Sequence, residues 1–103
     1  MNTILFKLWL INQGLSPKIS SDNISRLKRL NNSLINSSIS SDIDTLYKKD
    51  KCSTLLECFK NNGNNQFMDL YKLSSLPVGK PQIHTYKSAL QKYISFKEEY
   101  PNG

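Results

Sequence analysis

The chain has 103 residues, a length that fits one domain with a single modest hydrophobic core. Its hydrophobic fraction of 38% and aromatic fraction of 10% favour a folded domain with loose ends over a disordered chain. Fourteen Lys and Arg against eight Asp and Glu give a net charge of +6, which favours an anionic partner such as nucleic acid or a membrane surface; solubility alone is the alternative.

The first predicted element runs from Thr3 to Gln13 and is apolar on nearly all sides. It stops at Gly14, the residue type best suited to a left-handed helix end, so we expect a buried helix. Within it, Trp9 is expected to anchor the core rather than to stack on bases. The segment is too short to span a bilayer and lacks the basic leader and cleavage site of a signal peptide, so we expect a cytoplasmic protein with no membrane partner.

A second helix is predicted from Ser16 and Pro17, an N-cap residue followed by proline at the first helical position. We expect it to fray into a loop near Asn36, because the Asn- and Ser-rich stretch 31–41 favours caps and turns. Its apolar positions recur at near-helical spacing, namely Ile19, Ile24, Leu27, Leu30 and Leu34. A basic flank accompanies them, formed by Lys18, Arg26, Lys28 and Arg29.

Short elements are predicted in the middle of the chain. Asp42 is suited to cap a short helix, and after the charged break 48–51 an i, i+3, i+4, i+7 apolar stripe predicts another helix over 52–59. The Asn and Gly run 61–65 ends that helix. Residues 66–81 are expected to be mostly loop, with an optional turn or short helix, and strand patterns are absent from the sequence.

The last predicted helix starts near Pro81, and Lys97 is the last residue assigned to its apolar face. The apolar face carries Ile83, Tyr86, Leu90, Tyr93, Ile94 and Lys97, and the polar face carries His84, Lys87, Ser88, Gln91 and Lys92. Residues 98–103 are expected to be a tail or a linker to something longer. The whole pattern predicts an all-α fold, a compact bundle of four to five short helices in one domain over residues 1–97.

Catalytic and cofactor signatures are missing from this sequence. His84 is the sole histidine and lies on a polar helix side, so no Ser or Cys has a predicted base beside it, and no glycine-rich phosphate loop is present. Cys52 and Cys58 are too far apart on one helix to form a disulfide, and no zinc ligand set accompanies them. We therefore expect no enzyme activity, no cofactor and no metal in this chain.

Several short motifs carry a resemblance. The stretches Leu15–Ile19, Ile24–Leu27, Asp42–Tyr47, Ile83–Leu90 and Tyr93–Phe96 together resemble the helical amino-terminal domain of tyrosine recombinases and similar domains fused to bacterial restriction endonucleases. The resemblance implies a domain that clamps double-stranded DNA while a separate catalytic domain or subunit cuts it. It places Tyr86, Leu90 and Tyr93 in the core and puts phosphate or groove contacts at Lys18, Arg26, Arg29, Lys80, Lys87 and Gln91; we add His84 as a further phosphate contact.

Two functional hypotheses follow. The first is a DNA-binding domain, the recognition or targeting module of a restriction-modification or recombination enzyme. The second is a protein–protein interaction module, such as a subunit adaptor or a phage- or plasmid-type inhibitor, that docks through surface positions of Leu8, Trp9, Phe67 and Tyr71. Burial of these side chains favours the first hypothesis, and an exposed cluster favours the second.

Overall fold

A computed structural model describes residues 1–73 and 76–102, and within these ranges every regular element is helical. The elements are α1 (Thr3–Asn12), α2 (Pro17–Ile35), α3 (Ile43–Asp50), α4 (Ser53–Glu57), the 3₁₀ turn η1 (Lys60–Gly63), α5 (Gln66–Tyr71) and α6 (Ile83–Glu99). The expected all-α bundle is confirmed, although the described ranges hold six α-helices rather than four to five. None of these helices is long and apolar enough to cross a membrane.

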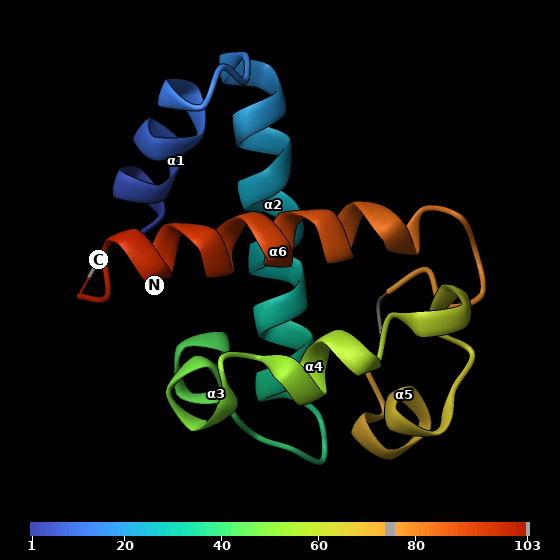
Figure 1. Cartoon of the computed structure of the whole chain (residues 1–103). Coiled ribbons are helices and arrows are strands. Elements are labelled where there is room, and N and C mark those ends of the chain that lie inside the picture. The colour runs from blue at the N-terminus through green and yellow to red at the C-terminus, as the bar shows by residue number, and fades with distance from the viewer. Residues whose placement is uncertain (74–75, 103) are drawn as a thin grey trace.

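Two long helices form the frame of the molecule. Figure 1 shows α6 crossing the middle of α2 at a steep angle, with α1 beside the first half of α2 and the short helices α3, α4 and α5 gathered around its second half. The chain ends near residues 1 and 102 lie at the same side of the molecule (Figure 1). Because α2 and α6 cross rather than run side by side, each has stretches beyond the crossing that do not cover the other.

Aromatic side chains join α1 to α6. Phe6 is fully buried, and its ring centroid lies 5.2 Å from that of Tyr93 and 5.3 Å from that of Phe96. Trp9 stacks on Phe6 at 6.2 Å and is partly buried against the core, so the expected core anchor lies at the edge of the core rather than inside it. Its indole N–H donates to Glu99 at the end of α6. Such aromatic contacts add to the free energy gained by burial alone.

Local caps explain where the helices begin. The Ser16 hydroxyl accepts from the Ile19 amide at 3.2 Å and Pro17 occupies the first position of α2, as the sequence predicts. Asp42 caps α3 through the Thr45 amide at 2.8 Å. Asn65 caps α5 in the same way, because its side chain accepts from the Met68 amide at 3.0 Å. The sequence had indicated mostly loop in this region. That N-cap is the signal from which the additional helix could have been recognised.

Three details of the sequence interpretation are wrong. The helix expected over 52–59 is shorter, because Lys51 and Cys52 both adopt left-handed backbone conformations (φ 56° and 63°) that separate α3 from α4. Ile19 is 50% exposed although it was expected on the buried face of α2. The optional turn or short helix within 66–81 was expected to pack Leu70 on the core, yet Leu70 is 68% exposed on α5. The turn of α2 that carries Ile19 buries Ser20 instead, and α5 buries Met68 and Tyr71 rather than Leu70.

A buried hydroxyl links α6 to α3. Tyr93 is fully buried, and its hydroxyl donates to Asp44 Oδ1 at 2.5 Å, while the second oxygen of Asp44 pairs with the amino-terminal ammonium at 3.1 Å. Burial of the ring and the neighbouring carboxylate both raise the pKa of Tyr93, so the hydroxyl stays protonated as the donor. The bond therefore fixes α3 against the central turns of α6.

We predict that Tyr93→Phe lowers the free energy of unfolding by about 1–3 kcal/mol, because Asp44 then loses a charge-assisted hydrogen bond inside a partly buried site. Urea unfolding followed by circular dichroism measures the change. Tyr100→Phe removes a hydroxyl from an exposed ring and serves as the control, with an expected change below about 0.5 kcal/mol. Equal effects of the two substitutions would show that the Tyr93–Asp44 bond contributes nothing specific.

Candidate nucleic-acid interface

Two arginines of α2 meet the beginning of α6. Arg26 and Arg29 are three residues apart, a spacing that places their side chains on one side of the helix about 5–6 Å apart at Cβ. Both line an open depression of about 460 Å³ together with residues from the start of α6 and the segment before it. Its lining residues are Arg26, Arg29, Leu76, Pro77, Gln82, Thr85 and Tyr86.

A second, smaller depression adjoins the first. It measures about 240 Å³ and shares Arg26, Arg29 and Tyr86 with the larger one, while Asp22 and Ser25 of α2 complete its lining. We refer to the two together as the α2–α6 hollow. Arg26 and Arg29 therefore line both parts of the hollow.

Tyr86 holds one of these arginines in place. The Tyr86 side chain is 6% exposed and belongs to the core, but its hydroxyl oxygen accepts a hydrogen bond from Arg29 Nη1 at 3.1 Å. A buried ring thus orients a guanidinium group at the surface. An arginine held in one orientation loses less side-chain entropy when it binds a ligand than a freely rotating one.

The charge of the hollow is only partly balanced. Within the described ranges neither Arg26 nor Arg29 takes part in an ion pair. Asp22, the carboxylate that lines the smaller depression, pairs instead with Lys18 at 3.3 Å. Two like charges one turn apart on a helix are mildly destabilising. Arg26 and Arg29 therefore form a net positive site, and a bound anion would reduce the repulsion between them.

The structure separates the remaining predicted contacts from the arginines. A helix turns about 100° per residue, so Gln91, nine residues after Gln82, points to the opposite side of α6. His84 and Lys87 lie on that same opposite side, which faces away from the α2–α6 hollow. Lys80 is exposed in the turn before α6. The seven predicted residues therefore do not form one surface. Arg26 and Arg29 come together, and Lys18 lies further along the same side of α2, paired with Asp22. His84, Lys87 and Gln91 form a second group, and Lys80 lies in the turn before α6.

The backbone amides at the amino terminus of α6 do not form an anion site. The amide groups of Ile83, His84 and Thr85 each donate at 3.1 Å to a backbone carbonyl three residues earlier. These donors are therefore already used, although they would need to be free to bind a phosphate. Positive charge in this region comes from side chains instead.

Sequence reasoning missed several residues around the hollow. Gln82, Thr85 and Tyr86 recur at the i, i+3, i+4 spacing of one helix side, which is a usable signal, but nothing in the sequence shows that α2 crosses there.

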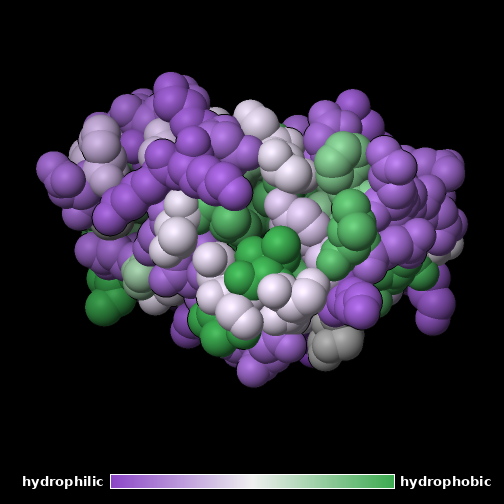
Figure 2. All heavy atoms as spheres, turned by 90° about the horizontal axis from the view of Figure 1, so that it is seen from below, coloured by the Kyte–Doolittle hydropathy of each residue, from purple (hydrophilic) through white to green (hydrophobic). Residues whose placement is uncertain are grey.

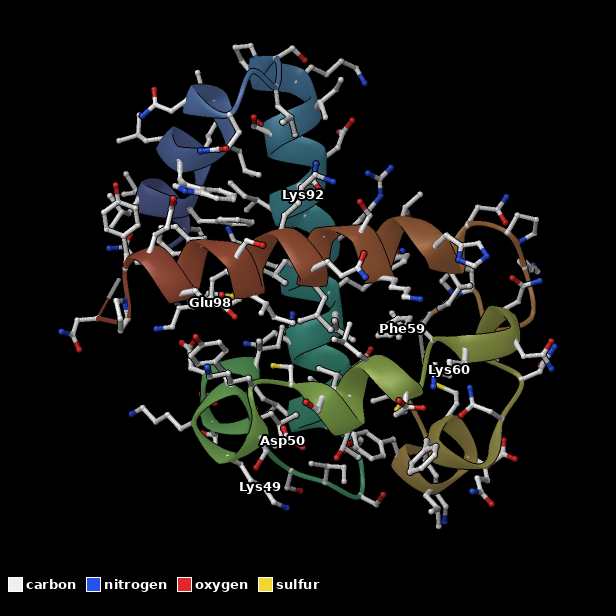
Figure 3. All side chains as sticks on the ribbon, viewed as in Figure 1. Lys49, Asp50, Phe59, Lys60, Lys92 and Glu98 are labelled. Carbon is white, nitrogen blue, oxygen red and sulfur yellow. The ribbon has the colours of Figure 1, made fainter. Side chains whose placement is uncertain are left out.

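Lys92 lies seven residues after Thr85 and so on the same edge of α6. Figure 3 shows the Lys92 side chain leaving α6 toward the first half of α2, whereas Glu98 leaves toward α3. Lys92 donates to Ser88 Oγ at 2.5 Å.

The side chains named for protein docking do not form one exposed cluster. Tyr71 is buried, Trp9 and Phe67 are partly buried against the core, and Leu8 is 55% exposed. The exposed apolar positions of α1 are instead Ile4, Leu8 and Ile11, at i, i+4 and i+7. Seen from below, the face formed by the short helices has apolar residues gathered between hydrophilic margins (Figure 2).

The two cysteines have the properties of core residues. Both are free and buried, as expected from their spacing. Burial raises the pKa of the Cys52 thiol and of the Cys58 thiol to about 12. Among the residues described, no three His, Cys, Asp or Glu side chains approach closely enough to hold a metal ion.

Comparisons of the chain with protein-family models, with curated proteins and with solved structures find no match. The resemblance to recombinase and restriction-endonuclease domains therefore stays a hypothesis that rests on short motifs. The functional argument for this chain depends on the geometry and charge of the α2–α6 hollow.

We predict that neither thiol of the folded protein reacts with an aromatic disulfide reagent at neutral pH, because the reactive thiolate is scarce at a pKa of about 12 and the sulfurs are buried. Absorbance of the released thiolate measures the reaction. In denaturant both thiols should react rapidly, which provides the control. Rapid reaction of either cysteine without denaturant would contradict the burial described here.

Proposed function

We propose that this chain is a DNA-binding helical domain and that the α2–α6 hollow is the centre of its binding surface. The observation that carries the proposal is the pair Arg26 and Arg29, which lie one turn apart on α2. Within the described ranges neither arginine has a carboxylate partner, and polar groups of α6 line the same hollow. The resemblance adds that such a domain serves as the recognition or targeting module of a restriction-modification or recombination enzyme, whose catalytic part lies in another domain or subunit.

Arginine chemistry supports a phosphate partner. A guanidinium group presents several N–H donors in a planar fork that matches two phosphate oxygens at once, and such charge-assisted bonds are stronger than neutral ones. Arg29 is already oriented by Tyr86, and Lys92 extends the positive charge along the same edge of α6. The net charge of +6 adds long-range attraction to a polyanion.

The exposed stripe on α1 supports a second candidate function, a protein contact. Ile4 is 77% exposed, Leu8 55% and Ile11 36%, and together they form one apolar side of a surface helix. A domain that targets a catalytic subunit needs such a contact as well as a DNA surface, so this candidate is compatible with the first. It becomes the principal function if the chain binds no DNA at low salt.

We predict that Arg26→Gln/Arg29→Gln weakens binding to a short labelled duplex and lowers the salt dependence of the binding constant by about two counterions, because each lost phosphate contact removes about one. Fluorescence anisotropy at several salt concentrations, between about 50 and 200 mM, measures both quantities.

The matched control is Lys48→Gln/Lys49→Gln. It removes the same two charges from exposed positions in the last turn of α3, at the other end of the molecule from the start of α6 (Figures 1 and 3). Its salt dependence should stay close to that of the wild type. Equal losses in the two double variants would show that only net charge matters, and Lys80→Gln/Lys87→Gln tests the other side of α6 in the same assay.

A further inference from the structure

The α2–α6 hollow offers more space than a phosphate group alone would fill. Its larger depression, about 460 Å³, falls within the range of about 300–1,000 Å³ that is usual for pockets holding small organic groups. Phosphates on the outside of a duplex would contact Arg26 and Arg29 without entering it. The volume of the hollow therefore leaves room for a group larger than a phosphate.

The walls of this depression differ in chemistry. Leu76 and Pro77 provide an apolar wall from the segment before α6, and the two arginines of α2 contribute the cationic groups of the same lining. Leu76 also packs against the core, which gives this wall a firm backing. The hollow thus combines an apolar surface with an anion-binding pair.

Polar groups complete the lining. Thr85 Oγ1 donates to the Gln82 carbonyl at 2.7 Å, so its oxygen keeps lone pairs with which to accept a further bond. The Gln82 amide carries both donors and an acceptor and is exposed. Such groups match the edge of a nucleobase, which also presents donors and acceptors.

We propose that the hollow receives one unpaired nucleotide of a DNA strand. Its phosphate binds between Arg26 and Arg29, and its base lies against Leu76 and Pro77 with its edge toward Gln82 and Thr85. The oriented guanidinium of Arg29 adds a flat cationic plane of the kind on which bases stack. This inference rests on the proposed DNA-binding function and specifies the form of DNA that binds best.

Two physical reasons favour an unpaired nucleotide. A base within a duplex is stacked and its edge is paired, and extruding it costs a few kcal/mol before any contact is made. A nucleotide that is already unpaired enters without that cost.

The test compares two labelled DNAs, a blunt duplex and the same duplex with one unpaired nucleotide at its centre, in anisotropy titrations of the full chain. The wild type should bind the bulged DNA about tenfold more tightly, in line with the energy of packing one base on a protein surface. Thr85→Phe, which fills the hollow without changing its charge, should reduce this ratio to about one or two; the ratio of the two affinities, rather than either affinity alone, is the quantity compared.

Controls separate this inference from the proposed function. Leu76→Ala removes the apolar wall and should also reduce the ratio, while Ser95→Leu, at an exposed position of α6 ten residues from Thr85, should keep it. Equal binding of the two DNAs by the wild type would overturn the inference and leave DNA binding intact. Absence of binding to either DNA at low salt would overturn both. Competition by free mononucleotide as strong as by bulged DNA would also overturn it.

Discussion

The crossing of α6 over α2 is the constraint on which the site depends. Helices that cross at a steep angle contact each other over a few turns, so the residues just beyond the contact are left facing each other across a gap. On one side of this crossing lie Arg26 and Arg29 from α2 with Gln82 and Thr85 from α6. A parallel arrangement of the two helices would have closed the hollow with side chains.

Core residues fix the crossing. Phe6 of α1 contacts both Tyr93 and Phe96, so α1 holds the second half of α6, and the Tyr93–Asp44 bond holds α3 against the same stretch. Tyr86 lies two turns earlier and extends from the core to Arg29. The buried side of α6 thus contributes to the core along most of the helix, and near the start of the helix it orients Arg29. This arrangement couples the stability of the fold to the geometry of the proposed interface.

Periodicity and capping chemistry were sufficient to predict most of the fold. Ser16, Pro17 and Asp42 mark helix starts that the structure confirms. Helical spacing placed Tyr86, Leu90 and Tyr93 on the apolar face of the last helix, and all three are buried. The predictions failed where tertiary context decides. Ile19 matches the apolar spacing of α2, but at that turn the polar Ser20 is the buried residue. Helix α5 depends on the Asn65 cap within a run that otherwise favours turns.

The candidate site was predictable only in part, for the same reason. The basic flank of α2 is visible in the sequence, but which side of α6 meets it depends on the crossing angle and on the rotation of α6 about its axis. If α2 had met the other flank of α6, Lys87 would lie beside the arginines and Thr85 away from them. Sequence periodicity fixes the buried side of α6 and leaves the choice between its two flanks open.

The most direct test of this account is a map of backbone amide chemical shifts in the isotope-labelled chain as a short duplex is added at low salt. The account predicts that the largest changes cluster at residues 22–29 of α2 and 82–86 of α6, with small changes over α3 and α4. Changes centred on His84, Lys87 and Gln91 without α2, or spread evenly over all lysines, would contradict the assignment of the interface to the α2–α6 hollow.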